Sequence, residues 1–214
     1  MLFRSLKQDT AALSDAQILK AIGATESKPE GLFFPDTYMF PLGASDLDVY
    51  KRAYKEQQSR LAKIWVSRPA DSPLKTPYEA LTLASIVEKE TGREEDRDKV
   101  AAVFLNRLKI GMMLQSDPTT IYGMGDDFDG NLRRKDLKTD TPFNTYTRNG
   151  LTPTPISMPG ANSLKAIMNP ANISALYFVA RGDGTSEFSD DLAAHNRAVN
   201  KYQRSGKPAK AAEQ

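Results

Sequence analysis

One segment of this 214-residue chain limits its fold more than any other. Thr76, Pro77 and Glu79 combine a capping hydroxyl, a proline at the first helical position and a glutamate three residues after the cap. The sequence Ala-Leu-Thr-Leu-Ala-Ser-Ile-Val follows over residues 80–87 and is apolar on nearly every side. Such a helix must be enclosed by other elements, so we predict a buried helix over residues 78–91 at the centre of a globular domain.

The composition excludes several kinds of chemistry. The chain has no Cys and one His, which removes thiol nucleophiles and Cys-ligated metals and disfavours multi-histidine metal sites and Ser-His-Asp triads. A formal net charge of +2 argues against a dedicated nucleic-acid binder. Acid–base catalysis by carboxylates therefore remains the most open possibility.

Other elements are predicted from capping signals and apolar spacing. Further helices are expected over residues 15–22, 46–66, 95–110, 133–137, 163–168 and 191–203. Short strands are expected within residues 32–40, 112–122 and 176–189.

Two glutamates end the predicted buried helix, where an unpaired ionised carboxylate is costly. Glu88 shares a helical stripe with Ala84 and Ser85, whereas Glu90 lies about 200° away and shares one with Val87. One of them could be a carboxyl in a partly apolar wall that donates a proton near neutral pH. Alternatively, both pair with a basic residue at the helix end, namely Lys89, Arg93, Arg97 or Arg107, and spacing alone slightly favours this second interpretation.

Further polar and aromatic side chains gather in segments rich in Pro and Gly: Gln115, Asp117, Tyr122, Asn144, Tyr146, Ser157 and the pair His195-Asn196. Amides, hydroxyls and aromatic faces together suit a sugar ligand. Asp117 could equally cap a turn, and Asn144 could bond its own loop. His195 fits a structural histidine better than a catalytic base.

Eight motifs in order across residues 14–203 resemble the YceG-like family of bacterial endolytic murein transglycosylases. They are Glu30-Gly-Leu-Phe-Phe-Pro-Asp-Thr-Tyr38, Leu83-Ala-Ser-Ile-Val-Glu-Lys-Glu-Thr91, Val103-Phe-Leu-Asn-Arg-Leu108, Leu114-Gln-Ser-Asp-Pro-Thr119, Tyr122-Gly-Met124, Phe143-Asn-Thr-Tyr146, Pro159-Gly160 and Leu176-Tyr-Phe-Val-Ala180. Each motif alone is weak, but their order makes the resemblance specific.

The resemblance implies an enzyme that cuts between N-acetylmuramic acid and N-acetylglucosamine inside peptidoglycan strands and leaves 1,6-anhydromuramyl ends. The family's catalytic Glu falls on Glu88, which would serve first as general acid and then as base. Glu90 is assigned to support of the substrate-binding site rather than to proton transfer. The matched positions around the site are Gln115, Asp117, Tyr122, Asn144 and Tyr146. The resemblance implies neither a metal nor a cofactor.

Two alternatives remain open. A lysozyme-type hydrolase would need a second carboxylate, Asp117 or Glu90, opposite Glu88. A non-catalytic glycan-binding or division scaffold would have no activity, so Glu88→Gln would change nothing in an activity assay.

For the fold we expect the α+β class, with a helical, lysozyme-like core beside the short strands. Residues 1–30 are interpreted as the remnant of an N-terminal LysM-like region that is mostly absent, 31–203 as the catalytic domain and 204–214 as a flexible tail. The longest strongly apolar run, residues 175–180, is too short to cross a membrane. The resemblance implies an N-terminal anchor in the bacterial inner membrane outside this sequence, and a periplasmic domain. The expected partners are glycan strands and peptidoglycan synthases or division proteins, without nucleic acid.

Overall fold

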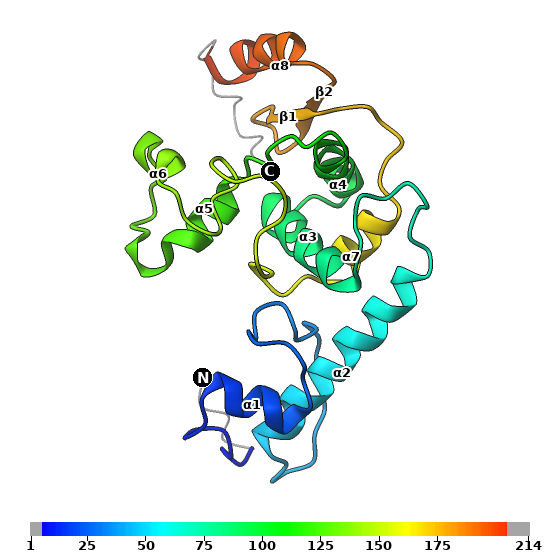
Figure 1. The fold of residues 1–214 in the computed structure, drawn as a ribbon, viewed down its shortest axis with the longest axis vertical. Coiled ribbons are helices and arrows are strands. Elements are labelled where there is room, and N and C mark those ends of the chain that lie inside the picture. The colour runs from blue at the N-terminus through cyan, green and yellow to red at the C-terminus, as the bar shows by residue number, and fades with distance from the viewer. Residues whose placement is uncertain (1–5, 205–214) are drawn as a thin grey trace, which may run out of the picture.

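A computed structural model describes residues 6–204 of the chain (Figure 1). Its elements in order are α1 (Asp15–Ile22), α2 (Asp46–Trp65), α3 (Pro77–Glu90), α4 (Glu94–Lys109), α5 (Asp117–Met124), a 3₁₀ turn (Gly125–Asp127), α6 (Arg134–Lys138), α7 (Ala161–Met168), β1 (Tyr177–Ala180), β2 (Ser186–Ser189), α8 (Leu192–Val199) and a π-helical turn (Asn200–Arg204). This helix-rich architecture with a small sheet confirms the α+β class.

Helix α3 is the centre of the fold. Thr76 caps it by accepting a 3.1 Å hydrogen bond from the backbone N–H of Glu79. Every residue from Ala80 to Val87 is buried, and α3 packs against α2, α4, α5 and α7. The predicted buried helix is therefore confirmed, and its carboxyl end lies where several elements meet.

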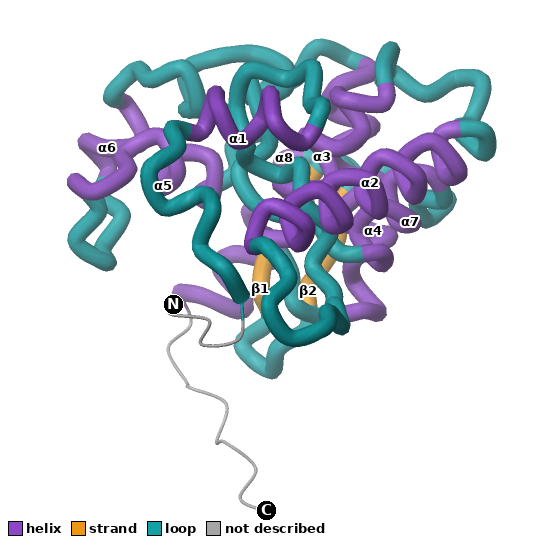
Figure 2. Tube along the Cα trace, turned by 90° about the horizontal axis from the view of Figure 1, so that it is seen from below, coloured by secondary structure: helices purple, strands orange, loops and turns teal. Residues whose placement is uncertain are grey.

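The N-terminal part consists of α1, α2 and the segments that lead into them. Helix α1 packs on the first half of α2, and α2 then runs on to contact α3 and α7 (Figure 2). Residues on both sides of positions 30 and 31 thus pack on one helix, and the proposed domain boundary there stays a prediction. Most of the predicted tail, residues 205–214, lies outside the described residues.

The predicted hairpin at residues 176–189 is confirmed. Strands β1 and β2 are antiparallel, with Phe178 opposite Phe188. Gly182 and Gly184 turn the chain between them with positive φ angles, which glycine adopts without strain. Helix α8 covers the hairpin, and Asp191 caps it through a 2.8 Å bond from the N–H of Ala194.

The strand expected within residues 32–40 is absent, and that prediction is wrong. The segment is a loop that packs on α2, where the N–H of Phe34 donates to the carbonyl of Ala53 over 3.1 Å. Pro35 and Pro41 cannot donate to a strand ladder, so Phe34 is buried and the other aromatic side chains are half-buried without forming a sheet.

The prediction of a strand within residues 112–122 is also wrong, because Asp117–Met124 form α5. Pro118 lies in the first turn of the helix, where proline is favourable. The β-branched Thr119 nevertheless fits, since its hydroxyl donates to the carbonyl of Ser116 over 2.7 Å. Local pairing of the threonine with the preceding turn outweighs its strand preference.

Among residues 6–204, no helix combines the length and hydrophobicity needed to cross a bilayer.

Candidate active site

Glu88 and Glu90 end α3 on different sides of the helix. Oε2 of Glu88 accepts a 2.6 Å hydrogen bond from the hydroxyl of Ser163 and a 3.1 Å bond from the N–H of Gly160 at the start of α7. Arg97 of α4 lies 3.5 Å from the same oxygen and donates a 2.9 Å bond to Ser163. The carboxyl of Glu88 is therefore held as an acceptor that joins three helices.

Glu90 faces α5, and like Glu88 it is half-buried. Its Oε2 accepts one 2.8 Å hydrogen bond, from the hydroxyl of Ser116. Burial raises the pKa of Glu90 to about 7; the Ser116 bond opposes this, the charge of Asp117 adds to it and the charge of Arg107 opposes it. A carboxyl that titrates near pH 7 can both give up and take back a proton at neutral pH.

A turn before α5 brings Ser116 to Glu90. Gln115 has a φ of +50°, an uncommon conformation for a residue other than glycine. The N–H of Gln115 donates to the carbonyl of Thr145 over 3.1 Å, and the N–H of Ser116 donates to the Thr145 hydroxyl over 3.0 Å. These bonds fasten the two predicted substrate-binding segments together and leave the Gln115 side chain exposed.

Asp117 and Tyr146 form a pair beside Glu90. The Tyr146 hydroxyl donates a 2.6 Å hydrogen bond to Oδ1 of the exposed Asp117. Burial, followed by this bond and the charges of Asp117 and Glu90, raises the pKa of Tyr146, so it remains a protonated donor at neutral pH. Asp117 thus presents an exposed carboxylate next to Glu90.

Asn144 has a different position from the one expected of a substrate-binding residue. Its side chain is fully buried, with 0% of its surface exposed. The amide donates to the carbonyls of Asp136, Leu137 and Thr139 at 3.3, 3.2 and 2.7 Å. The side-chain oxygen accepts from the N–H of Tyr146 and the Thr120 hydroxyl. With its bonding capacity filled from within, Asn144 shapes the loop that presents Tyr146, and its contact with substrate stays a prediction.

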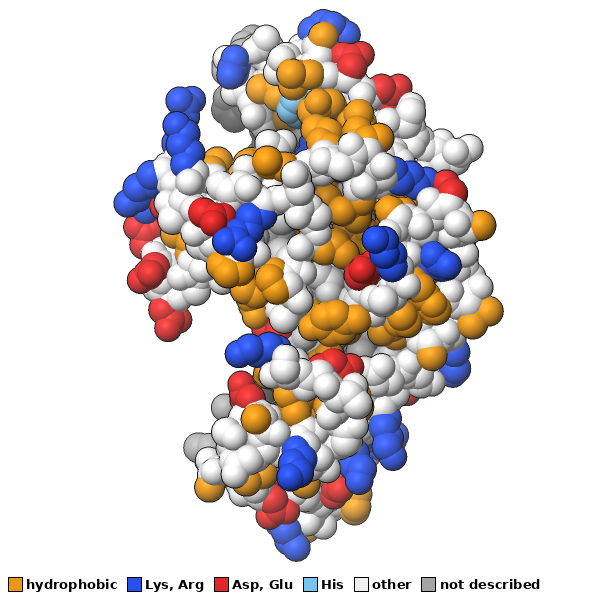
Figure 3. Space-filling view, in the orientation of Figure 1, with side chains coloured by type: hydrophobic (Ala, Val, Ile, Leu, Met, Phe, Trp, Pro, Cys, Tyr) orange, Lys and Arg blue, Asp and Glu red, His pale blue; other side chains and the backbone are white. Residues whose placement is uncertain are grey.

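Tyr122 joins the site region to the N-terminal part. Its hydroxyl donates a 3.4 Å hydrogen bond to Glu30, and its ring lies 4.8 Å from that of Phe143. The molecular surface is hollowed between the N-terminal part around α1 and the part that carries α5 and α6 (Figure 3). The Tyr122–Glu30 bond links α5 to the N-terminal part. The Tyr122–Phe143 pair offers aromatic faces of the kind that pack against sugar rings.

Two hydrogen-bond partners of the two glutamates were not singled out from sequence: Ser116 and Ser163. Arg97, one of the basic residues expected to pair with them, does contact Glu88. Only Ser116, which lies between Gln115 and Asp117, had a local signal. His195 stacks on Tyr177 with ring centres 5.1 Å apart, in agreement with its structural interpretation. In the described part of the chain, no group of three or more His, Asp or Glu side chains is arranged to hold a metal ion.

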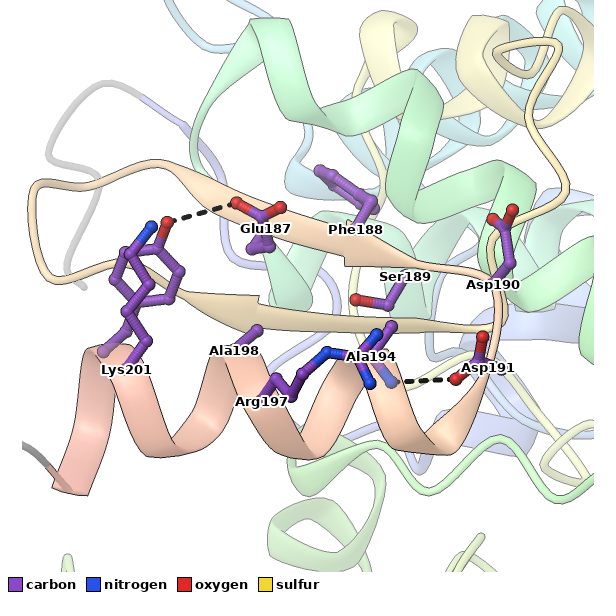
Figure 4. A pocket seen from close by; sticks show the side chains of 10 residues that line it. Glu187, Phe188, Ser189, Asp190, Asp191, Ala194, Arg197, Ala198 and Lys201 are labelled. Carbon is purple, nitrogen blue, oxygen red and sulfur yellow. Dashed lines mark hydrogen bonds between the residues drawn. The ribbon is translucent and has the colours of Figure 1, made fainter.

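A separate groove of about 430 Å³ lies between β2 and α8 (Figure 4). Its lining includes Glu187, Phe188 and Arg197 but none of the predicted site residues. Tyr202 donates to Glu187 across one end of it over 3.3 Å.

The fold and site together define a helical α+β domain. Its buried central helix ends in Glu90, a half-buried carboxyl beside the Tyr146–Asp117 pair. The chain belongs to the YceG-like family, whose sequence model matches residues 2–201. This finding confirms the resemblance.

Three known proteins illustrate the relationship. The endolytic murein transglycosylase of Bacillus subtilis (strain 168) is 39% identical over 173 residues, which make up 81% of this chain and 48% of that protein. The endolytic murein transglycosylase of Streptococcus pneumoniae (serotype 2, strain D39) is 31% identical over 175 residues, 79% of this chain and 31% of that protein. The crystal structure of a YceG-like protein from Listeria monocytogenes matches with a TM-score of 0.70 and 33% identity, covering 85% of this chain and 62% of that one. The chain spans about half or less of the length of the two transglycosylases that it matches.

Proposed function

We propose that this domain is the catalytic part of an endolytic lytic transglycosylase that cleaves glycan strands of peptidoglycan between N-acetylmuramic acid and N-acetylglucosamine. Two relatives are named endolytic murein transglycosylases, the hollow in the surface suits an extended sugar chain, and the Tyr122–Phe143 pair offers aromatic faces for sugar rings. The substrate implies that the domain works outside the cytoplasm. The membrane anchor and the synthase or division partners stay predictions.

The observation that carries the mechanism is the environment of Glu90. The sequence pattern assigned proton transfer to Glu88, but three donors already occupy Oε2 of Glu88. Glu90 has one donor and a pKa raised by burial to about 7. We therefore assign proton transfer to Glu90 and the support of the helix junction to Glu88, which reverses the roles given by the motif.

In this mechanism the protonated Glu90 gives its proton to the glycosidic oxygen while the bond from that oxygen to C1 of the muramyl residue breaks. The resulting carboxylate then takes the proton of the C6 hydroxyl as O6 forms a bond to C1. The product is a 1,6-anhydro ring, and Glu90 is protonated again. The carboxylate of Asp117, oriented by Tyr146, is placed to stabilise the positive charge that develops between the two steps.

The second candidate is a lysozyme-type muramidase in which water replaces the C6 hydroxyl. One observation favours it: the charge of Asp117 reaches Glu90, so a second carboxylate is near the proposed acid. The two reactions differ in their products, because hydrolysis leaves reducing ends and the transglycosylase reaction leaves anhydro ends.

Mass spectrometry of uncrosslinked glycan strands treated with wild-type protein, Glu90→Gln, Glu88→Gln and Asp117→Asn separates these mechanisms. We expect anhydromuramyl ends from the wild type, none from Glu90→Gln, and detectable anhydro products from Glu88→Gln if it remains folded. Activity in Glu90→Gln together with its loss in a folded Glu88→Gln protein would return the catalytic role to Glu88. Reducing ends that vanish with Asp117→Asn would identify the hydrolase, and no cleavage by wild-type protein would indicate a binding module.

A further inference from the structure

Arg107 of α4 is a buried cation that the proposed mechanism does not yet use. About 6% of its surface is exposed. Among residues 6–204, no ion pair within 4.0 Å includes it. A buried charge without a counter-ion is costly unless hydrogen bonds compensate, so its contacts indicate why the fold retains it.

The contacts of Arg107 are backbone carbonyls from two segments. Its Nη1 donates to the carbonyl of Leu114 over 2.6 Å and to that of Met113 over 3.4 Å. Its Nε donates to the carbonyl of Leu176 over 2.7 Å. Leu114 directly precedes the Gln115–Ser116 turn, and Leu176 directly precedes β1. One guanidinium thus fastens the turn beside Glu90 to the C-terminal hairpin.

The hairpin end of this connection is itself rigidly packed. The guanidinium carbon of Arg107 lies 5.3 Å from the centre of the Tyr177 ring. The Tyr177 ring also stacks on His195 of α8, with the two ring planes inclined by 25°. Cation–π and stacking contacts of this kind favour one orientation of the guanidinium.

Arg107 also acts on Glu90 through its charge. Its positive charge favours the ionised form of Glu90, against the effects of burial and of Asp117. In return, the charge of Glu90 favours the charged form of Arg107, whose pKa is lowered mainly by burial. The two groups therefore interact although no direct bond joins them.

We propose that Arg107 is a positioning residue for Glu90: its guanidinium fixes the turn that carries Ser116, and the Ser116 hydroxyl is the donor that binds Glu90. This inference rests on the proposed role of Glu90 as acid and base. Both halves of that role require a carboxyl that is neither too weak nor too strong an acid at the working pH.

The direct test is an NMR titration of the ¹³C-labelled Glu90 carboxyl in the whole chain, with its signal assigned by its loss in Glu90→Gln. Arg107→Met and Arg107→Gln should raise the titration midpoint by about half to one pH unit. Arg107→Lys, which keeps the charge, should leave it near the wild-type value. The matched control is Arg97→Met, because Arg97 is another arginine of α4 but contacts Glu88 instead. It should not shift the titration midpoint of Glu90.

An unchanged midpoint in folded Arg107→Met or Arg107→Gln would overturn the electrostatic role. If both neutral variants fail to fold, the kcat/KM of Arg107→Lys tests the positioning role. Lysine cannot reproduce a fork of three carbonyl contacts, so we expect kcat/KM to fall about tenfold with the midpoint retained. Wild-type kcat/KM in Arg107→Lys would overturn the proposal.

The pH–rate profile gives a second readout that a purely structural role would not move. The alkaline limb should shift upward in the neutral variants together with the NMR midpoint. If Glu90→Gln still cleaves glycan strands, the proposed function of Glu90 fails, whereas the titration continues to report whether Arg107 acts on it. The two failures are therefore distinguishable.

Discussion

Glu88 and Glu90 lie two residues apart on α3, yet serines from different elements bind them: Ser163 of α7 holds Oε2 of Glu88 at 2.6 Å, and Ser116 before α5 holds Oε2 of Glu90 at 2.8 Å. The helical geometry requires this divergence, since positions two apart point in nearly opposite directions. One carboxyl therefore joins the core helices, while the other faces the proposed active site.

The first prediction concerns how Glu90 affects stability at different pH values. Its folded pKa of about 7 exceeds the ordinary value of 4.5, so folded Glu90 resists ionisation. Below pH 4.5 it is protonated in both the folded and unfolded states; as pH rises through 7, the stability contributed by its proton is lost. Glu90→Gln should therefore raise the free energy of unfolding by about 1–3 kcal/mol at pH 8 relative to wild type, and give little gain at pH 4. Urea denaturation at both pH values measures this.

Glu88→Gln is the matched control for that experiment. It weakens the contact with Arg97 and the junction with α7, so we expect it to lower stability by about 1 kcal/mol at pH 8. Stabilisation by Glu88→Gln, or destabilisation by Glu90→Gln at pH 8, would contradict the assigned environments.

The second prediction concerns the Tyr146 hydroxyl. Tyr146→Phe keeps the ring but removes the 2.6 Å bond that orients Asp117. We expect kcat/KM on glycan strands to fall about 10- to 100-fold with little change in thermal stability. Tyr202→Phe, which removes a hydroxyl bonded to Glu187 far along the chain, should retain wild-type activity. Equal activities of the two variants would exclude a role for the Tyr146 hydroxyl.

A third prediction addresses Asn144 as a structural residue. Asn144→Ala would strand three carbonyls, the Tyr146 N–H and the Thr120 hydroxyl in the interior. The expected loss is about 2–4 kcal/mol of unfolding free energy. The exposed Asn149 in the same loop provides the control, and Asn149→Ala should be nearly neutral. A stable but inactive Asn144→Ala protein would instead favour substrate contact.

The fourth prediction uses two glycines that share a backbone conformation. Gly31 and Gly43 have φ angles of +78° and +83°. A Cβ on Gly31 would collide with Pro155, with its Cγ at 2.7 Å, and would lie 3.1 Å from the carbonyl oxygen of Ser157. A Cβ on Gly43 would meet nothing within 4 Å. Gly43→Ala should cost about 1 kcal/mol through strain alone, and Gly31→Ala about 1–3 kcal/mol more. Equal losses in thermal denaturation would show that the contact between the N-terminal loop and Pro155 is loose.

Local sequence signals predicted most of the helices. The Ser14–Gln17 capping box begins α1, and the Thr76–Pro77 start begins α3, as expected. The same reasoning failed for residues 32–40, where aromatic content favoured a strand but Pro35 and the adjoining Pro41 prevent pairing. It also failed at Asp117–Met124, where a strand was expected but a proline in the first turn and the hydroxyl bond of Thr119 to the preceding turn favour a helix.

The sequence by itself determined that α3 is buried, that two carboxyls end it, and that these carboxyls diverge, because those properties follow from apolar periodicity and the helical repeat. Only the tertiary structure decided what surrounds each carboxyl. Ser163 and Arg97 reach Glu88, whereas Ser116 and the charges of Asp117 and Arg107 act on Glu90. Desolvation and hydrogen bonding depend on elements distant in sequence, so no local pattern could show which glutamate is held as an acceptor and which titrates near neutral pH.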